Sequence, residues 1–359
     1  MPAAGRAQRY DERDVRIRPG RGSRPRTKQR PEHADAEVAL VTAVDRGRYA
    51  ILVDPDGPDE RVAIAMKARE LGRERVVPGD RVDIVGDTSG DEGSLSRIVR
   101  IGERRTVLRR TADDTDPVER IIVANADQLV IVTALADPEP RTRMIDRCVA
   151  AAYDARMDAL LALTKADLAD PATLVDMYAP IGVQVVVSSR GDGRVIDGLE
   201  AIRDALDGRT SVLVGHSGVG KSTLVNALVP GTGRAVGVVN DVTGRGRHTS
   251  SSAVALRVPG TREPTWVIDT PGVRSFGLAH VDPQHLLGAF ADLAEVAQEC
   301  PRGCTHADDA PDCALDEWVQ ASPDDVTRAA RAARVESFRR LLASRLGSGE
   351  PEQRESARP

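Results

Sequence analysis

Apolar positions in the first third of the chain form short β-rich runs separated by turn signals. Between residues 37 and 108 the runs are followed by Gly, Pro and Asp clusters that favour turns. The runs lie at residues 38–41, 49–53, 61–64, 81–85 and 95–99. Five strands this short predict an N-terminal all-β barrel of the OB type over residues 37–108. Such a barrel either binds nucleic acid or only docks onto a partner, because the fold alone does not fix its function.

The middle of the chain alternates continuous apolar runs with amphipathic helical patterns, which predicts a parallel α/β sheet. The expected strands are 128–133, 159–163, 183–187, 211–214 and 265–268. The expected helices are 144–153, 171–178, 195–206 and 222–229, with Asp170 and Pro171 starting the second. On such sheets, ligands bind beyond the carboxyl ends of the strands. We expect Cys148, inside the first helical pattern, to be a core residue.

The end of the chain predicts a helix from Ser322, an N-cap followed by Pro323, to about residue 346. Its arginines are expected to point outward, where they would meet ribosomal RNA or form a solvated face; they are Arg328, Arg331, Arg334, Arg339 and Arg340.

Composition adds limits to this picture. The net charge is only −5, but residues 1–36 are rich in arginine and poor in bulky apolar residues. This predicts a disordered basic arm, suited to nucleic-acid phosphates or without a role, and residues 347–359 read as a disordered tail. Aromatic residues are 3% of the chain, so we expect backbone contacts more than stacked bases. With no apolar run long enough for a membrane, no secretory signal and four cysteines, we expect a cytoplasmic protein.

The segment 215–223 fits the phosphate-loop pattern G-x-x-x-x-G-K-[ST] between a predicted strand and a predicted helix. Its glycines allow backbone N–H groups to approach phosphate, and the following helix directs its positive end there. Lys221 is expected to reach the β- and γ-phosphates and Ser222 to bind Mg²⁺. The nucleotide contacts predicted here are Gly215, His216, Ser217, Gly218, Val219, Gly220, Lys221, Ser222 and Thr223.

Three further motifs follow predicted strands. Thr164-Lys165-Ala166-Asp167 is similar to N-K-x-D, in which the carboxylate of Asp167 would accept two hydrogen bonds from guanine. Ser188 and Ser189 follow the next strand and are a second candidate contact with the base.

The third motif, Asp269-Thr270-Pro271-Gly272, fits D-x-x-G. Asp269 would hold Mg²⁺ and the N–H of Gly272 would meet the γ-phosphate, so these motifs together favour GTP. The stretch 231–252 is predicted to be a first switch loop in which Thr249, or Ser250, contacts Mg²⁺.

The order of these motifs is unusual for a GTPase, since Thr164–Asp167 precedes the phosphate loop instead of following it. A circular permutation explains this order, because moving the termini leaves the site intact. The chain then leaves the nucleotide domain just after the second switch, which would tie the C-terminal residues to the nucleotide state.

With this motif order, the chain resembles the ribosome small-subunit-dependent GTPase family (RsgA, also called YjeQ). The resemblance covers about residues 37–346 and includes segments 124–128, 164–167, 215–223, 247–249, 269–272 and 334–338 and the cysteine cluster. It implies an OB barrel (37–108), a permuted GTPase domain (109–277) and a zinc-binding helical domain (278–346). It also implies binding to the small ribosomal subunit during late assembly, with GTP hydrolysis stimulated there. We expect a monomer that binds GTP and GDP, contacts ribosomal RNA and has no membrane association.

Two residues bear on the hydrolysis mechanism. Where Ras-like proteins place a water-orienting glutamine after D-x-x-G, this chain has Val273, so slow intrinsic hydrolysis is expected. His248 is the candidate for positioning water; alternatively a partner supplies that group, and His248 contacts RNA or nothing.

Cys300, Cys304, His306 and Cys313 together form a typical closed ligand set for structural Zn²⁺. The family spacing is usually C-x4-C-x-H-x5-C, and here the middle pair lies one residue earlier. A disulfide with a spare thiol is the alternative, disfavoured in a cytoplasmic protein.

The sequence therefore predicts a GTP hydrolase that acts in assembly of the small ribosomal subunit, with Mg²⁺ and one Zn²⁺ as cofactors. Two alternatives stay open: a permuted GTPase with another ribosomal or RNA partner, and a non-enzymatic RNA-binding scaffold.

Overall fold

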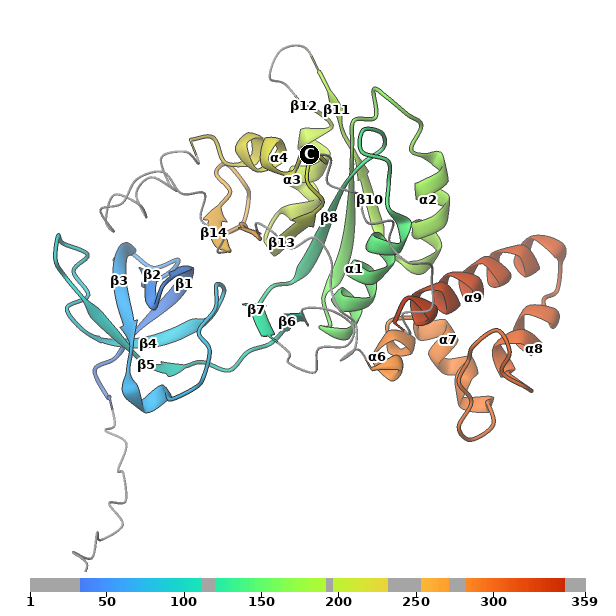
Figure 1. Cartoon of the computed structure of the whole chain (residues 1–359), viewed down its shortest axis with the longest axis horizontal. Helices are drawn as coiled ribbons and strands as arrows, with labels where there is room; N and C mark the ends of the chain where they lie inside the picture. Colours follow the sequence, from blue (N-terminus) through green and yellow to red (C-terminus); the bar gives the residue numbers. More distant parts are fainter. Residues whose placement is uncertain (1–32, 111–119, 192–195, 232–252, 271–281, 346–359) are drawn as a thin grey trace, which may run out of the picture. The chain divides into compact units, whose positions relative to one another are not determined.

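A computed structural model describes residues 33–110, 120–191, 196–231, 253–270 and 282–345 of the chain (Figure 1). Contacts divide the chain into two units, Met1–Ala34 and Asp35–Pro359. Everything below concerns the second unit, because nearly all of the first lies outside the described residues. The predicted basic arm, the segment 111–119 and the C-terminal tail also lie outside them.

The predicted N-terminal barrel is confirmed as a closed ring of five strands (Figure 1). The strands pair in the order β1-β2-β3-β5-β4, and β4 pairs with β1 to close the ring. The strands are β1 (Glu37–Asp45), β2 (Arg48–Val53), β3 (Arg61–Lys67), β4 (Arg81–Gly86) and β5 (Ser96–Ile101), with a 3-10 turn η2 (Arg69–Leu71) between β3 and β4. Tyr49, Ile51 and Val53 of β2 alternate into the barrel core, as the period of a strand requires.

The predicted parallel sheet is confirmed as well. Its strands pair in the order β10-β9-β8-β13-β15, all parallel, and β14 pairs antiparallel with β15. They are β8 (Gln128–Ala134), β9 (Asp158–Thr164), β10 (Gln184–Val187), β13 (Thr210–Gly215), β14 (Val254–Arg257) and β15 (Trp266–Asp269). β14 also pairs with β1 of the barrel, at Val254 and Ala43.

Helices cover both faces of this sheet, and the side chains of β8 show how. Leu129 and Ile131 point to the face that α1 covers, whereas Val130 and Val132 belong to the core under α3 and α4. Both faces are buried, which explains why the strands read as continuous apolar runs. The helices are α1 (Thr142–Asp154), α2 (Ala172–Tyr178), α3 (Leu199–Leu206) and α4 (Lys221–Leu228), with η3 (Ala179–Ile181) after α2. Cys148 is 2% exposed, so its predicted place in the core is confirmed.

The C-terminal helices share a core with one face of the sheet. Phe290, Phe338 and Leu341 lie in the same apolar cluster as Ile145 and Val149 of α1, and the Phe290 and Phe338 rings meet edge to face at 5.5 Å. These helices are α6 (Pro283–Gly288), α7 (Ala291–Val296), α8 (Ala314–Gln320) and α9 (Asp325–Arg345), with η4 (Ala297–Glu299) after α7. None of the described helices is long and apolar enough to cross a membrane.

Two helix starts differ from the prediction, for different reasons. Asp324, not Ser322, caps α9: its carboxylate accepts from the Thr327 N–H at 2.7 Å. The third helix begins at Leu199, after Gly198 with φ 85°, rather than at residue 195. Several short elements were not predicted, because runs of two to five residues carry too little periodic signal. They are β6 (Val107–Arg110), β7 (Arg120–Ala124), β11 (Ser189–Arg190), β12 (Ile196–Asp197) and β14.

Candidate functional site

The carboxyl end of β13 leads directly into the phosphate-loop segment. β13 ends at Gly215, α4 begins at Lys221, and the five residues between them turn the chain. Gly218 and Gly220 have φ 83° and 91°, a backbone region that favours glycine. A Cβ on Gly220 would lie 3.6 Å from the Thr164 hydroxyl oxygen, so this turn packs closely against the neighbouring strand end. The strand, glycine turn and helix therefore have the arrangement that the phosphate-loop pattern predicts.

Thr164 connects the predicted base-binding segment with this loop. It is the last residue of β9 and is 8% exposed. Its hydroxyl donates a 2.6 Å hydrogen bond to the Val219 carbonyl inside the glycine turn. The threonine that departs from the N-K-x-D pattern thus holds the two segments together.

The rest of this segment contacts two neighbouring loops. Lys165 has φ 59° and its ammonium group donates to the Asp137 carbonyl in the loop before α1. The Ala166 N–H donates to the Ser188 carbonyl at 3.1 Å. Asp167 accepts a 3.1 Å hydrogen bond from the Arg190 N–H through one carboxylate oxygen, and its second oxygen has no partner among the residues that the structure describes.

The two candidate serines differ in their surroundings. Ser188 is 4% exposed, and its hydroxyl donates to the Leu163 carbonyl at 3.1 Å. Ser189 is half-buried, with its hydroxyl 3.5 Å from the Asp197 carboxylate. Ser188 therefore joins the ends of β9 and β10, and a contact of either residue with a base stays a prediction.

Lys221 and Asp269 face each other across the ends of β13 and β15. The Lys221 ammonium group donates to the Asp269 carboxylate, and both side chains are partly buried. Next to them, the Thr270 hydroxyl donates to the Leu213 carbonyl at 2.7 Å, which fixes the end of β15 against β13. The structure therefore places the predicted phosphate and Mg²⁺ residues side by side. His248, Thr249, Gly272 and Val273 lie outside the described residues.

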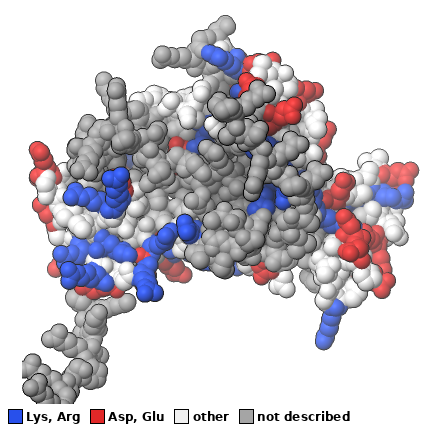
Figure 2. Space-filling view, in the orientation of Figure 1, with Lys and Arg blue, Asp and Glu red and all other residues white. Residues whose placement is uncertain are grey.

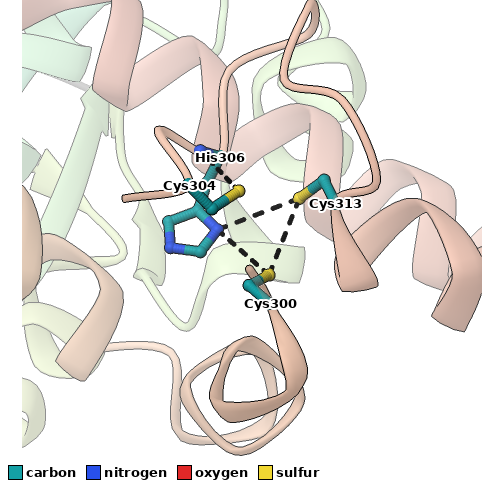
Figure 3. A group of neighbouring side chains, drawn as sticks. All are labelled: Cys300, Cys304, His306 and Cys313. Carbon is teal, nitrogen blue, oxygen red and sulfur yellow. Dashed lines mark hydrogen bonds between the residues drawn. The ribbon is translucent and has the colours of Figure 1, made fainter. Parts of the chain in front are cut away.

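Cys300, Cys304, His306 and Cys313 converge at a second centre between η4 and α8 (Figure 3). Their ligand atoms all lie within 4.8 Å of one another. The Cys300 sulfur is 4.0 Å from the Cys313 sulfur and 3.5 Å from His306 Nδ1, and Cys313 is 3.8 Å from the same nitrogen. All four cysteines of the chain are free thiols, so the disulfide alternative is wrong.

These separations fit a tetrahedral metal site. Zn–S bonds of about 2.3 Å and Zn–N bonds of about 2.0 Å put ligand atoms about 3.5–3.8 Å apart in a tetrahedron. Burial lowers the pKa of His306, with Arg339 adding to the effect, which favours the neutral imidazole that a metal needs. Burial also raises the pKa of the Cys300 thiol to about 11, and a bound cation would oppose that shift. The donor set is closed, which is typical of a structural rather than a catalytic metal.

The prediction that the arginines of α9 point outward is wrong for all of them except Arg328. Arg334 donates to Asp292 at 2.9 Å, Arg339 to Asp316 at 2.8 Å and Arg340 to Asp146 at 3.1 Å. The Arg331 guanidinium lies 4.4 Å from the Trp318 ring centroid. Only Arg328 of the five is largely exposed, with an ion pair to Asp325 one turn away. The partners lie far away in sequence, so the helix alone could not reveal them.

Asp146 is a structural residue that sequence reasoning missed. It is 3% exposed in α1, accepts from the Tyr178 hydroxyl at 3.0 Å and receives Arg340 on both oxygens. Burial raises its pKa, although Arg340 and Tyr178 oppose the shift. The sequence signal was an acid within the apolar run from Met144 to Ala152, where a charge requires a partner.

Comparisons with known proteins agree with this geometry. A family model described as RsgA GTPase matches residues 101–279. A small ribosomal subunit biogenesis GTPase RsgA from Chlorobaculum parvum is 33% identical over 315 residues, covering 85% of this chain and 97% of the relative. A protein of the same name from Pseudomonas aeruginosa is 39% identical over 263 residues, covering 71% of this chain and 73% of the relative.

Two solved structures share the fold. YjeQ from Thermotoga maritima matches with a TM-score of 0.60 at 21% identity, over 87% of this chain and 99% of that one. YloQ, described as a circularly permuted GTPase, matches with a TM-score of 0.60 at 20% identity, over 89% of this chain and 98% of that one. The permuted order inferred from the motifs is therefore the order of a known fold.

Proposed function

The chain belongs to the RsgA GTPase family, and from this membership we propose that it hydrolyses GTP during biogenesis of the small ribosomal subunit. The observation that carries the proposal is the meeting of three segments at one edge of the sheet. The phosphate loop, Thr164–Asp167 and Asp269 come from distant parts of the sequence and contact one another there.

We propose these roles for the site residues. Residues 215–223 and the Gly272 N–H bind the phosphates, and Lys221 neutralises charge on the β- and γ-phosphates during transfer. Ser222, Thr249 and Asp269 hold Mg²⁺. Asp167 recognises guanine through its second carboxylate oxygen, with Lys165, Ala166, Ser188 and Ser189 around the base. Thr164 supports this arrangement through its bond to the phosphate loop.

The water-positioning group is a separate proposal. Val273 has no polar atom for this role, so we expect slow hydrolysis by the protein alone. His248 in the first switch, or a group of the ribosomal partner, would then orient the attacking water. GTP and Mg²⁺ would order the stretch 231–252.

The Cys/His cluster is proposed to hold one structural Zn²⁺. Cys300, Cys304, His306 and Cys313 supply four donors within 4.8 Å of one another, and the separations among Cys300, His306 Nδ1 and Cys313 are 3.5–4.0 Å. The ion would fix the loop between η4 and α8, which packs against α9: Arg339 donates to the His306 carbonyl at 3.0 Å. The domain ranges proposed are 37–108 for an OB barrel, 109–277 for the permuted GTPase and 278–346 for the zinc domain.

The proposed partner is the small ribosomal subunit with its RNA, bound by a cytoplasmic monomer. Figure 2 shows several Lys and Arg side chains over the barrel. Arg46, Arg48 and Arg97 are exposed there, and Arg48 and Arg97 flank Met66 on neighbouring strands. With so few aromatic residues, these cations favour contacts to phosphate rather than to stacked bases. Because the arginines of α9 have protein partners, the barrel becomes the better candidate for RNA contacts.

The test is GTP hydrolysis by the full chain, alone and with purified small or large ribosomal subunits. We expect a slow basal rate that only small subunits raise, and its loss in Lys221→Ala. Stimulation by large subunits instead would indicate a permuted GTPase with another partner. RNA binding without any hydrolysis would favour the scaffold alternative and contradict the proposal.

A further inference from the structure

A polar cavity of ≈ 600 Å³, wide open to solvent, lies at the amino-terminal ends of the parallel strands, at the end opposite the phosphate loop. It is lined by Arg105, Arg156 and Arg209 and by Asp127 and Asp158, among others. Arg209 directly precedes β13, whereas the phosphate loop follows that strand. A six-residue strand spans about 20 Å, so this cavity is separate from the GTP site.

Two of the three guanidinium groups bond to a carboxylate and still have free donors, with the Arg105 side chain 68% and the Arg209 side chain 41% exposed. Arg105 donates from Nη2 to Asp127 at 3.0 Å. Arg209 donates from Nη1 to Asp158 at 2.7 Å and to Gln128 at 3.4 Å. In each case Nε and the other terminal nitrogen have no partner among the described residues. The two carboxylates therefore orient two arginines, and a third arginine leaves the cavity with a net positive charge.

The third arginine, Arg156, occupies a backbone position that favours glycine. It follows the end of α1 with φ 57°, and the Met157 N–H donates back to the Ala152 carbonyl at 2.9 Å. This is the helix-ending turn in which glycine is the usual residue. The Arg156 side chain is exposed and forms no ion pair with any residue that the structure describes. The chain therefore places an arginine beside the cavity at a backbone position where glycine would be less strained.

We propose that this cavity is a second phosphate-binding site, in which Arg105, Arg156 and Arg209 converge on one phosphate group. Guanidinium forks match the paired oxygens of a phosphate, and a pre-oriented fork loses little freedom on binding. The phosphate would belong to an RNA strand or to a small phosphate compound. The site is separate from the proposed GTP site, because none of its residues takes part in the proposed GTP binding; its RNA reading rests on the proposed RNA partner, and its phosphate reading does not.

The decisive variant is Arg156→Gly in the full chain saturated with GDP and Mg²⁺. Glycine adopts φ 57° without strain, so the thermal unfolding midpoint should stay the same or rise. Two probes are titrated: a labelled single-stranded RNA of mixed sequence and inorganic pyrophosphate. The control is Arg328→Ala, which removes an exposed arginine outside the cavity.

We expect Arg156→Gly to weaken RNA binding about tenfold and to reduce the salt slope of log K by about 0.7. GTP hydrolysis by Arg156→Gly should equal that of the unmodified protein. The Arg328→Ala control should bind both probes as the unmodified protein does. Weaker RNA binding assigns the site to an RNA backbone, and weaker pyrophosphate binding alone assigns it to a small phosphate compound. If both probes bind Arg156→Gly as tightly as they bind the unmodified protein, the proposal is overturned.

Discussion

Two cation–carboxylate pairs in this protein have opposite characters. At the nucleotide edge, Lys221 is the only described residue that donates to Asp269, whose side chain is 29% exposed. Under the C-terminal helix, the side chain of Asp146 is 5% exposed and both its oxygens are occupied, by Arg340 and Tyr178. The second oxygen of Asp269 has no partner among the described residues, whereas both oxygens of Asp146 accept hydrogen bonds. We infer that the Lys221–Asp269 pair can exchange its partner for a ligand, whereas the Arg340–Asp146 pair is buried and stabilises the fold.

The largest effect expected from this comparison follows Asp146→Ala. The substitution removes the counter-charge of Arg340, whose side chain is 29% exposed, so we expect the lower end of the cost of breaking a buried pair, about 3 kcal/mol. We expect the free energy of unfolding in urea to fall by about that amount. Asp325→Ala is the matched control, because that carboxylate is 94% exposed in its pair with Arg328, and it should cost less than about 0.5 kcal/mol. Equal losses in both variants would contradict the distinction between the two pairs.

Lys221→Ala should show the reverse pattern. Loss of the ammonium group at the transferring phosphate should reduce GTP hydrolysis at least about 100-fold, roughly 3 kcal/mol in activation free energy. Stability should change by less than about 1 kcal/mol, because Asp269 can be solvated once its partner is removed. The two measurements are steady-state hydrolysis and urea unfolding of the same preparation. A variant that hydrolyses GTP normally would remove Lys221 from the proposed mechanism.

Thr164→Val tests the hydrogen bond from the Thr164 hydroxyl to the Val219 carbonyl. This bond is buried, like the Arg340–Asp146 pair, and lies at the proposed ligand site, like the Lys221–Asp269 pair. The substitution keeps the side-chain shape but removes the donor to the Val219 carbonyl. An unpaired buried carbonyl costs about 1–3 kcal/mol, and the glycine turn should loosen. We therefore expect GTP affinity, measured by equilibrium titration, to fall about tenfold. Thr164→Ser keeps the hydroxyl and should retain most of the affinity.

The same contrast explains how much the sequence could predict. The phosphate loop depends on neighbours in the chain, so residues 215–223 were enough to predict a strand, a glycine turn and a helix. The four metal-cluster residues also lie close together and were found by their spacing. The arginines of α9 were interpreted wrongly as outward-facing, because Asp146 and Asp292 lie 194 and 42 residues away from their partners Arg340 and Arg334.

Residues such as Arg156 show a further limit of the sequence. No local pattern indicates that this residue adopts a left-handed backbone, because glycine, not arginine, is the usual residue at the left-handed position that ends a helix. Likewise, Arg105, Arg156 and Arg209 come from three connections that meet only when the sheet forms. Sites built from turns between distant strands therefore require the fold, whereas sites built on one turn do not.

The smallest expected effect is a pH dependence that has opposite signs for two carboxylates bound to α9. The side-chain hydrogen bond from Arg334 holds the pKa of Asp292 below its ordinary value of 3.8. Its contribution to stability is therefore present above about pH 4 and is lost as the pH falls through the lowered value. Burial raises the pKa of Asp146 above 3.8, so its contribution is present below pH 3.8 and is lost as the pH rises through the raised value.

Thermal unfolding midpoints between pH 7 and pH 3 separate the two contributions. Asp292→Asn should lower the midpoint slightly at pH 7 and make its decline toward pH 3 shallower than in the unmodified protein. Asp146→Asn should make the same decline steeper, because it removes the contribution that grows on acidification. If both variants shift the curve in the same direction, the buried and the exposed carboxylates do not differ as the structure indicates. Opposite shifts would show that acid weakens the Arg334–Asp292 pair, whereas it reduces the cost of burying the Asp146 carboxylate in its pair with Arg340.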